Sequence, residues 1–478
     1  MKRLACRSPW RVPPLLAVLG FATSAVAEPV ELPHAESVVQ TSVAPNAAEP
    51  APDRFVVVGR SETYLQLFRR ALLPGPGGAA VTSEVGSPLV QYLQVSARDV
   101  DAPWQEDAVE LELSAWGRVW PTSSGFERPF DGDLQTANVA LKAGPLSLRA
   151  GRQTLAGGAA RFVRFDGLSL SASLPAGLFV AAYGGWTVLP RWDARPGYQQ
   201  LGLKERELSS GEELSLSRAA HWLTGARFGY DSQRLRAVAS MHEQREAGGL
   251  AHRNLGLDAT AALGSSVDVG SALLYELDQR HFAELRGWLG LRPLPGVDAT
   301  LEALRTKPAL FLSRQSVLSV FGSSAYDEAG GFVSWRAFEF LRFDGAGYFE
   351  SYDTGRAGAR ADAAARFELG GALRTLVRLG YGRVIIGDEG YQALRASLGR
   401  QLARNLAATL DLYGYFYDRA VLGYRSSSVY SGSLSYRVSA PLELLWGASL
   451  FRSPYASLDA QTLLRLSYEL DATSGRRP

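Results

Sequence analysis

The chain has 478 residues, with 50 Lys and Arg against 48 Asp and Glu and a formal net charge of +2. Such a balance does not fit a nucleic-acid-binding protein, whose surface is strongly basic. Hydrophobic residues make up 46% of the chain, which excludes a largely disordered protein. A single cysteine excludes a disulfide framework and a metal site built from thiolates.

The first 27 residues have the features of a secretory signal. Basic residues precede a short apolar run at 15–22 (LLAVLGFA), which is shorter than the roughly 20 residues of a membrane span. Ala25 and Ala27 place small side chains at the −3 and −1 positions that signal peptidase requires. We therefore expect cleavage after residue 27, which would also remove Cys6.

Residues 28–88 are predicted to form a periplasmic lead-in. The first part, 28–53, is rich in Ala, Pro and Glu without periodicity, as in flexible segments. Residues 61–73 (SETYLQLFRRALL) resemble a capped helix that ends before Pro74. Such a helix would lie in the periplasm, or it would pack under or inside a barrel as a plug, and the sequence leaves these alternatives open.

From residue 89 onward, hydrophobic and polar residues alternate with period two, for example along 109–119, 373–381 and 462–470. Alternation of this kind places one set of side chains on each face of a sheet. The segments are about 9–12 residues long, which matches the length that a tilted strand needs to cross a bilayer. The pattern continues to residue 471, and 472–478 are expected to be a tail.

The connections between these segments also differ in length. Tight turns such as 143–145 contrast with long polar segments such as 190–220 and 418–428. Outer-membrane barrels have short periplasmic turns and longer extracellular loops. The sequence therefore predicts an all-β fold: a transmembrane antiparallel up-and-down β-barrel of about 18–22 strands, with a short N-terminal periplasmic or plug segment. Its location would be the bacterial outer membrane, with membrane lipid and the barrel assembly machinery as partners.

The charged positions of the alternating segments are predicted to line the pore. A charge facing lipid at the middle of the membrane costs about 2–4 kcal/mol, so inward placement is favoured. Acidic residues concentrate along 258–302 and arginines along 374–395, which predicts a transverse field unless these charges only neutralise one another. The predicted pore-lining residues are Arg149, Arg227, Arg234, Arg236, Glu276, Glu284, Arg286, Glu302, Arg374, Arg378 and Arg395.

Residues 148–170 (LRAGRQTLAGGAARFVRFDGLSL) contain a local motif: Gly151-Arg152-Gln153, then Gly157-Gly158, Arg161 and Arg164, and finally Phe165-Asp166-Gly167. This succession resembles outer-membrane porins of the alginate-export family, in which a GRQ strand end leads through a loop into an R-x-x-DG-like strand. The resemblance covers only these residues. It implies a porin barrel in which Arg152, Arg161, Arg164 and Asp166 lie near the pore mouth or its constriction.

Motifs of common enzyme classes are not found. The chain contains no phosphate-binding P-loop, no HExxH and no GxSxG pattern, and its histidines are not spaced as metal ligands on one strand face. His242 with a nearby carboxylate is the candidate for a hydrolytic site. We expect no enzymatic activity, no cofactor, no metal and no nucleic-acid partner.

The predicted function is an outer-membrane channel, either a porin or an exporter. It would pass small polar or saccharide-like solutes by passive diffusion, as a monomer or a trimer. Two alternatives stay open: a barrel plugged by its N-terminal segment with a structural or adhesive role, and an outer-membrane barrel hydrolase.

Overall fold

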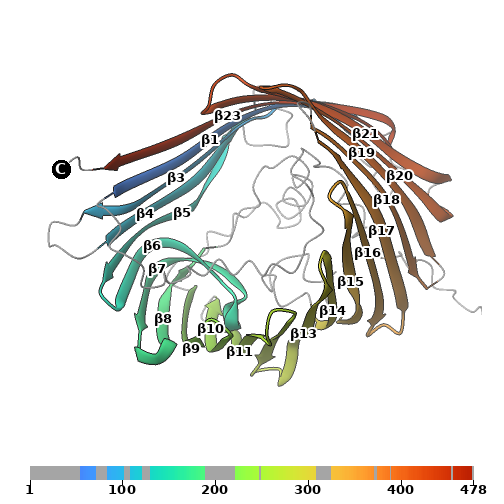
Figure 1. Ribbon diagram of the computed structural model, residues 1–478. Coiled ribbons are helices and arrows are strands. Elements are labelled where there is room, and N and C mark those ends of the chain that lie inside the picture. Colours follow the sequence, from blue (N-terminus) through green and yellow to red (C-terminus); the bar gives the residue numbers. More distant parts are fainter. Residues whose placement is uncertain are drawn as a thin grey trace, which may run out of the picture.

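The computed structural model describes residues 54–71, 83–101, 108–120, 130–188, 221–246, 249–307, 325–370, 374–387, 389–421, 423–453 and 456–475. Most of these residues belong to β-strands, which Figure 1 shows arranged as a ring. The elements are β1 (Arg54–Ala71), β2 (Ser83–Gly86), β3 (Leu89–Asp101), β4 (Ala108–Val119), β5 (Phe130–Ala143), β6 (Leu146–Ala156), η3 (Gly158–Ala160), β7 (Phe162–Ser173), η4 (Pro175–Gly177), β8 (Leu178–Thr187), β9 (Trp222–Asp231), β10 (Leu235–Glu246), β11 (Gly249–Ala262), β12 (Val267–Glu276), β13 (His281–Leu294), β14 (Val297–Thr306), β15 (Tyr326–Phe338), β16 (Leu341–Tyr352), β17 (Ala357–Leu369), β18 (Thr375–Ile386), β19 (Glu389–Ala403), β20 (Leu406–Val421), β21 (Tyr424–Arg437), β22 (Leu442–Ser453) and β23 (Ala456–Gly475).

These strands form a single antiparallel sheet that closes on itself. From β3 onward each strand pairs with the next one in the chain, and β1 pairs with both β3 and β23. Of the 23 described strands, β2 pairs with β1 alone, so 22 strands complete the ring. The all-β barrel prediction is confirmed, at the upper limit of the expected strand number.

The structure of β1 corrects the expected lead-in over residues 28–88. Residues 54–71 form neither a helix nor a plug but the first strand of the wall, with Leu65 opposite Leu464 of β23. The local sequence resembles a helix start, but pairing with the last strand closes the sheet and removes two free edges. The rest of that segment, 28–53 and 72–82, lies outside the described residues, as does the predicted signal at 1–27.

Two further boundaries differ from the expectation. β23 continues to Gly475, beyond the predicted barrel end at residue 471, because β1 supplies partners up to Arg54. The predicted loop at 418–428 is mostly strand: β20 extends to Val421 and β21 begins at Tyr424. The predicted loop at 190–220 lies outside the described residues.

The two ends of the barrel have connections of different length. At one end two-residue turns join neighbouring strands, such as 144–145 between β5 and β6 and 404–405 between β19 and β20. At the other end β8 and β9 are separated by 189–220, and β14 and β15 by 308–324, which lie outside the described residues. Following the asymmetry of outer-membrane barrels, the first is named the periplasmic end and the second the extracellular end.

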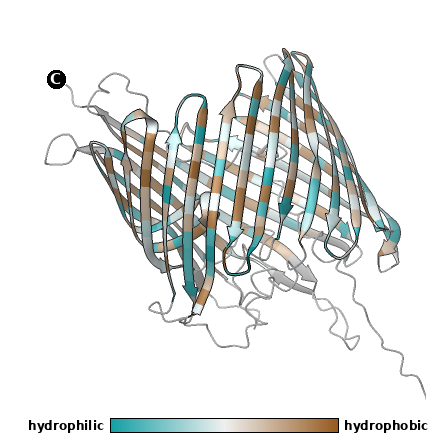
Figure 2. Ribbon diagram, turned by 90° about the horizontal axis from the view of Figure 1, so that it is seen from below, coloured by the Kyte–Doolittle hydropathy of each residue, from teal (hydrophilic) through white to brown (hydrophobic). Residues whose placement is uncertain are grey.

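The outer face of the barrel is apolar. Leu111 and Leu113 of β4 and Leu464 and Leu466 of β23 are 37–43% exposed, and similar side chains occupy alternate positions of most other strands. Figure 2 shows this alternation of hydrophobic and hydrophilic residues along the strands. So large an apolar surface requires a lipid environment, and a closed barrel satisfies its backbone hydrogen bonds within one. The chain is therefore a membrane-spanning β-barrel of the outer-membrane kind.

Tryptophans mark both rims of this outer face. Trp335 and Trp446 lie toward the periplasmic end and are half exposed, and Trp186 and Trp222 lie at the extracellular end. Amphipathic aromatic rings prefer the level of the lipid headgroups. Trp116, in contrast, is buried on the lumen face of β4, so not every tryptophan belongs to the two rims. Within the described residues no helix is long and apolar enough to cross a membrane.

A charged residue on the outer face is expected to destabilise the barrel strongly. Leu410 of β20 is 47% exposed on this face, and Leu410→Arg should lower the free energy of unfolding by about 2–4 kcal/mol. The neighbouring Thr409 faces the lumen and contacts Ser433, so Thr409→Arg should cost much less. Equilibrium unfolding of both variants in lipid vesicles measures the difference. Equal destabilisation would contradict the assignment of the two faces.

Candidate functional site

The lumen face carries most of the charged residues that the sequence predicts to line a pore. Positions that alternate with the exposed outer leucines face the lumen, and their cross-strand partners share that face. The predicted residues at such positions are Arg149, Arg227, Arg236, Glu276, Glu284, Arg286, Glu302, Arg378 and Arg395.

Two of the predicted pore-lining residues lie elsewhere. Arg234 belongs to the turn between β9 and β10, and Arg374 comes just before β18. Both are at the periplasmic end, where the period-two alternation no longer applies because the chain leaves the strand. Arg374 is 72% exposed and pairs with Glu368 at 2.9 Å.

The hairpin of β6, η3 and β7 folds into the lumen and lies against the inner faces of β10 and β11. The backbone N–H of Gly158 donates to Asp258 Oδ2 at 2.7 Å, and the N–H of Ala159 donates to Ser240 Oγ at 2.7 Å. Asp258 and Ser240 belong to the lumen faces of β11 and β10, several strands away around the ring. Figure 1 shows this hairpin turned inward from the wall. We name it the inward hairpin.

Glycines allow the bend and the close approach. Gly151 of β6 has a φ of 115°, a conformation that L side chains rarely adopt, and a Cβ there would meet the carbonyl oxygen of Ala137. On the wall, Gly256 leaves room for the backbone of Ala159, which a larger residue would displace. The glycines of the local motif therefore serve a sharp turn into the lumen.

Arginine side chains hold the inward hairpin in place. Arg161 Nη1 lies 2.8 Å from Asp258 Oδ1, and Arg161 Nε lies 2.9 Å from Glu284 Oε2. The Arg161 side chain is only 12% exposed, which strengthens both ion pairs. Arg227 Nη2 donates to the carbonyl oxygen of Ala156 at 2.8 Å. Two of the predicted residues, Arg161 and Arg227, thus attach the hairpin to the wall.

The other three predicted constriction residues form an ionic cluster on the same hairpin. Arg152 Nε donates to Asp166 Oδ1 at 2.6 Å, and Arg164 Nη1 donates to Asp133 Oδ2 at 2.8 Å. Arg152 lies 3.6 Å from Asp133 as well, and both arginines are largely buried. Asp133 is opposite Trp116 on the lumen face of β5, so the cluster lies on the lumen side of the wall.

A hydrophobic cluster supports the hairpin from beneath. Val163 and Phe165 of β7 pack against Tyr183 of β8 and Leu223 of β9, and Phe165 is fully buried. His242 of β10 lies next to this cluster, with its Nδ1 3.2 Å from the Tyr183 hydroxyl. His242 is 3% exposed, and no described carboxylate forms an ion pair with it. The position of His242 is that of a packed side chain beneath the inward hairpin.

Glu276 is buried between two histidines. Its Oε1 lies 3.8 Å from His252 Nδ1, and its Oε2 lies 3.9 Å from His281 Nε2. Glu276 is completely shielded from solvent, so it contributes to the wall rather than to the open lumen surface. Among the described residues no group of three or more His, Cys, Asp or Glu side chains is arranged to hold a metal ion.

The acidic stretch predicted at 258–302 is largely paired. Asp258 and Glu284 bind Arg161, and Glu302 lies 3.0 Å from Arg286 Nη2. Each of these three carboxylates has a neighbouring guanidinium, but Asp258 and Glu284 share Arg161, so the pairing leaves one negative charge unbalanced.

A row of arginines crosses β15 to β18 near the periplasmic end. Arg336 is the direct cross-strand partner of Arg342, Arg342 of Arg366, and Arg366 of Arg378. Like charges directly opposite one another destabilise a sheet, so the row lowers the stability of the fold. We name it the arginine row. Of these four residues only Arg378 was predicted to line the pore, although the other three show the same period-two spacing from outer leucines and phenylalanines.

Acidic neighbours compensate only part of the arginine row. Arg342 Nε lies 2.9 Å from Asp344, and Arg366 Nη2 lies 3.0 Å from Glu368, which Arg374 also binds. One carboxylate shared between two arginines leaves excess positive charge. At this level near the periplasmic end, the wall of β15 to β18 therefore carries more arginines than carboxylates.

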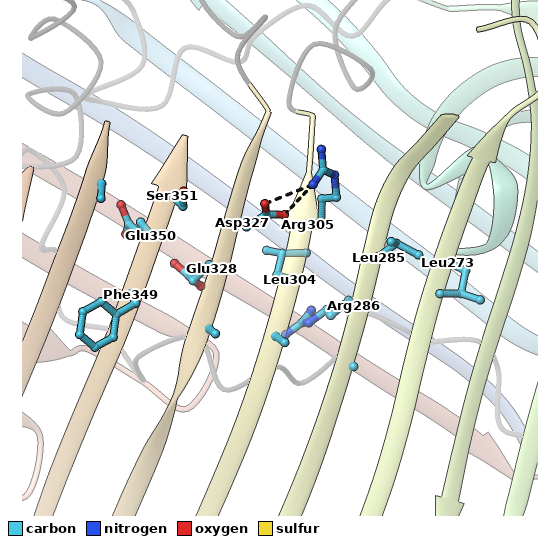
Figure 3. A pocket seen from close by; sticks show the side chains of 14 residues that line it. Leu273, Leu285, Arg286, Leu304, Arg305, Asp327, Glu328, Phe349, Glu350 and Ser351 are labelled. Atoms are coloured by element: carbon cyan, nitrogen blue, oxygen red, sulfur yellow. Dashed lines mark hydrogen bonds and ion pairs between the residues drawn. The ribbon is translucent and has the colours of Figure 1, made fainter. Parts of the chain in front are cut away.

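A hollow of ≈ 680 Å³ lies along β12 to β17, and Figure 3 shows its lining. Arg286, Glu328 and Glu350 of this lining belong to the lumen face, whereas Arg305 and Asp327, joined at 3.2 Å, belong to the outer face. Residues of both faces line the hollow, so it is a depression in the curved wall and not a cavity inside the lumen. It does not define a ligand site.

No protein-family model matches the sequence, and no curated protein matches it either. Among solved structures the chain is similar to the outer membrane protein opdK from Pseudomonas aeruginosa, at 11% identity and a TM-score of 0.40, over 87% of this chain and 99% of that one. It is similar to Acinetobacter baumannii OccAB4 at 9% identity and a TM-score of 0.42, over 89% and 100%. It is also similar to a BenF-like porin from Pseudomonas fluorescens Pf-5 at 10% identity and a TM-score of 0.37, over 87% and 99%.

Proposed function

We propose that the barrel is an outer-membrane channel through which small polar solutes diffuse passively. The observation that carries this proposal is the inward hairpin, an ordered segment that narrows a wide lumen lined by charged side chains. A barrel with only a structural role has no need of a hairpin that is turned into its interior and attached to the inner wall by Arg161 and Arg227. A charged interior favours water and polar solutes over apolar ones.

The residues predicted to line the pore and those predicted to lie at the constriction take two roles in this proposal. Arg161 and Arg227, with Asp258 and Glu284, fix the constriction, and the ionic cluster around Arg152 forms its lumen surface. Arg149, Arg286, Glu302, Arg378 and Arg395 set the electrostatic potential along the path. Because the described strands close the ring within one chain, a monomer is sufficient for one pore, and a trimer would consist of three such pores. The same proposal includes the barrel assembly machinery as the partner that inserts this barrel into the outer membrane.

Single-channel recording of the refolded protein in a planar lipid bilayer tests the proposal. We expect stable conductance steps that disappear when the same preparation is heat-denatured before addition. Swelling of proteoliposomes in small neutral and charged solutes should show uptake that falls with solute size. A protein that is demonstrably inserted, shifts on heating in electrophoresis and yet neither conducts nor admits solutes would refute a channel.

A further inference from the structure

Four tyrosines gather on the lumen face of β19 and β20. Tyr413, Tyr415 and Tyr417 occupy alternate positions of β20, and Tyr391 of β19 is the cross-strand partner of Tyr417. The rings of Tyr391 and Tyr415 are in contact, with centroids 5.9 Å apart and planes at 64°. We name these four residues the tyrosine track. Its signal in the sequence is the period-two repeat YGYFY at 413–417.

Small residues flank Tyr415 at the centre of the tyrosine track. Its cross-strand neighbours are Ala393 on β19 and Ser427 on β21, and Gly382 on β18 lies beyond Ala393. Tyr391 and Tyr413 have the larger neighbours Val384 and Val429, so the ring of Tyr415 has the least crowded surroundings. All four tyrosine side chains are half-buried. In the described part of the chain the hydroxyls of Tyr391, Tyr413 and Tyr415 form no hydrogen bond, so they remain available to a ligand.

Charged groups of both signs accompany the rings. Arg395 is the cross-strand partner of Tyr413, and Asp411 is the next lumen-facing residue on the same strand. The carboxylate of Asp362 on β17 extends over Gly382 toward Tyr391. A Cβ atom on Gly382 would lie 2.6 Å from Asp362 Oδ1. Donors and acceptors therefore alternate around the aromatic surface.

The track continues into a hollow at the extracellular end. Arg356, Glu389 and Arg419 line this hollow, which measures ≈ 430 Å³. Arg356 Nη2 lies 3.5 Å from Glu389 Oε2, and both side chains are about one-third exposed. Glu389 precedes Tyr391 by two residues and Arg419 follows Tyr417 by two, so all share the lumen face with the tyrosine track. The hollow therefore adjoins the extracellular end of the tyrosine track.

The chemistry of this surface fits a ring that has apolar faces and a polar edge. A pyranose presents C–H groups on its faces, which stack on aromatic rings, and hydroxyls on its edge, which both donate and accept hydrogen bonds. Arginine supplies only donors and carboxylates only acceptors, so a hydroxyl-rich edge satisfies both. An apolar solute would leave these charged groups unpaired, and an anion would meet Asp362, Glu389 and Asp411 alongside the arginines, so a neutral solute rich in hydroxyls suits both signs of charge.

We propose that the tyrosine track and the hollow above it bind neutral oligosaccharides as they enter the lumen. This inference rests on the proposed channel function and names one class of solute for it. The track offers successive stacking surfaces along β20, separated by two residues of extended strand, so a chain of linked sugar rings engages several of them at once.

Block of single-channel current by maltohexaose tests the inference. We expect added sugar to interrupt the current in a concentration-dependent manner, whereas a polyethylene glycol of similar size does so much less. Replacing Tyr391 and Tyr415 with leucine should raise the half-blocking concentration by about ten-fold or more, since two stacking surfaces are lost. The open-channel conductance should stay nearly unchanged, because leucine is uncharged and smaller.

A matched control uses another pair of lumen tyrosines in edge-to-face contact. Tyr64 and Tyr92 lie 5.5 Å apart on β1 and β3, away from the tyrosine track, and their leucine variants should leave block by sugar unchanged. Equal effects of both double variants would overturn the inference. So would block by trigalacturonate with none by maltohexaose, which would instead indicate an acidic ligand.

The failure of the inference and that of the channel are distinguishable. Steady conduction without any block by maltohexaose would leave the channel in place and refute the saccharide site. If the inserted protein is silent, titration calorimetry of maltohexaose in detergent micelles decides about the site independently. Binding that the Tyr391/Tyr415 variant abolishes would support it, and no binding to the unmodified protein would refute it.

Discussion

Replacing Arg161 with alanine is expected to release the inward hairpin and to raise the single-channel conductance. The substitution removes two short ion pairs and leaves Asp258 and Glu284 without their common cation. Breaking a buried pair by removing one partner is strongly destabilising, and after discounting for the partial exposure of Asp258 we expect about 2 kcal/mol, or roughly a thirty-fold shift toward the undocked hairpin. The ring of 22 strands does not depend on this contact and should still form.

Recordings of Arg161→Ala should therefore show a larger mean conductance with frequent transitions between levels. Arg161→Lys retains the charge but cannot bind both carboxylates in the same forked geometry, and an intermediate effect is expected. Arg292→Ala is the matched control, since Arg292 is half exposed and pairs with Asp268 near a periplasmic turn. A conductance of Arg161→Ala identical to that of the unmodified protein would show that the inward hairpin does not limit the pore.

Neutralising the arginine row is expected to shift the ion selectivity toward cations. In the triple variant Arg342→Gln, Arg366→Gln and Arg378→Gln, three neighbouring positive charges disappear from one wall of the lumen. A unit charge about 4 Å from a permeating ion is worth about 1 kcal/mol even in water, which corresponds to roughly a five-fold change in the permeability ratio of chloride to potassium. The reversal potential under a salt gradient measures this ratio.

Ionic strength provides an internal check of the same prediction. The Debye length falls from about 10 Å at 0.1 M to about 3 Å at 1 M, so the difference between the variant and the unmodified protein should shrink at high salt. Arg305→Gln with Arg383→Gln serves as the control, because these arginines lie on the outer face in ion pairs with Asp327 and Asp418. A control that shifts selectivity as much as the triple variant would contradict a role for the arginine row.

The inward hairpin also explains why charged residues stand at unexpected positions of β6 and β7. By strand alternation Arg152, Arg164 and Asp166 share positions with the exposed Leu168 and Leu170, and would face lipid in a straight strand. The bend beginning at Gly151 carries this end of the hairpin away from the wall, and the arginines meet Asp133 on the lumen side. A charged lipid face is thereby avoided.

The sequence by itself determined the class of fold and the two faces of the wall. The period-two alternation, as in Leu464, Leu466, Tyr468 and Leu470 opposite Arg465 and Ser467, assigns each side chain to lipid or lumen without knowledge of its partners. The strand length follows from the bilayer thickness, and so the barrel was predictable. The local motif around residue 151 likewise pointed to a constriction.

Only the tertiary structure decided which strand closes the ring and what holds the hairpin. β1 was missed because its pattern also suits a helix, and its partner β23 lies at the other end of the chain. The contacts of Arg161 with Asp258 and Glu284 span 97 and 123 residues, a separation at which local sequence carries no information on pairing. Alternation determines whether a side chain points to lipid or to the lumen. Which residues it contacts there depends on barrel closure and on the inward hairpin, and these follow from the register and bends of all the strands in the ring.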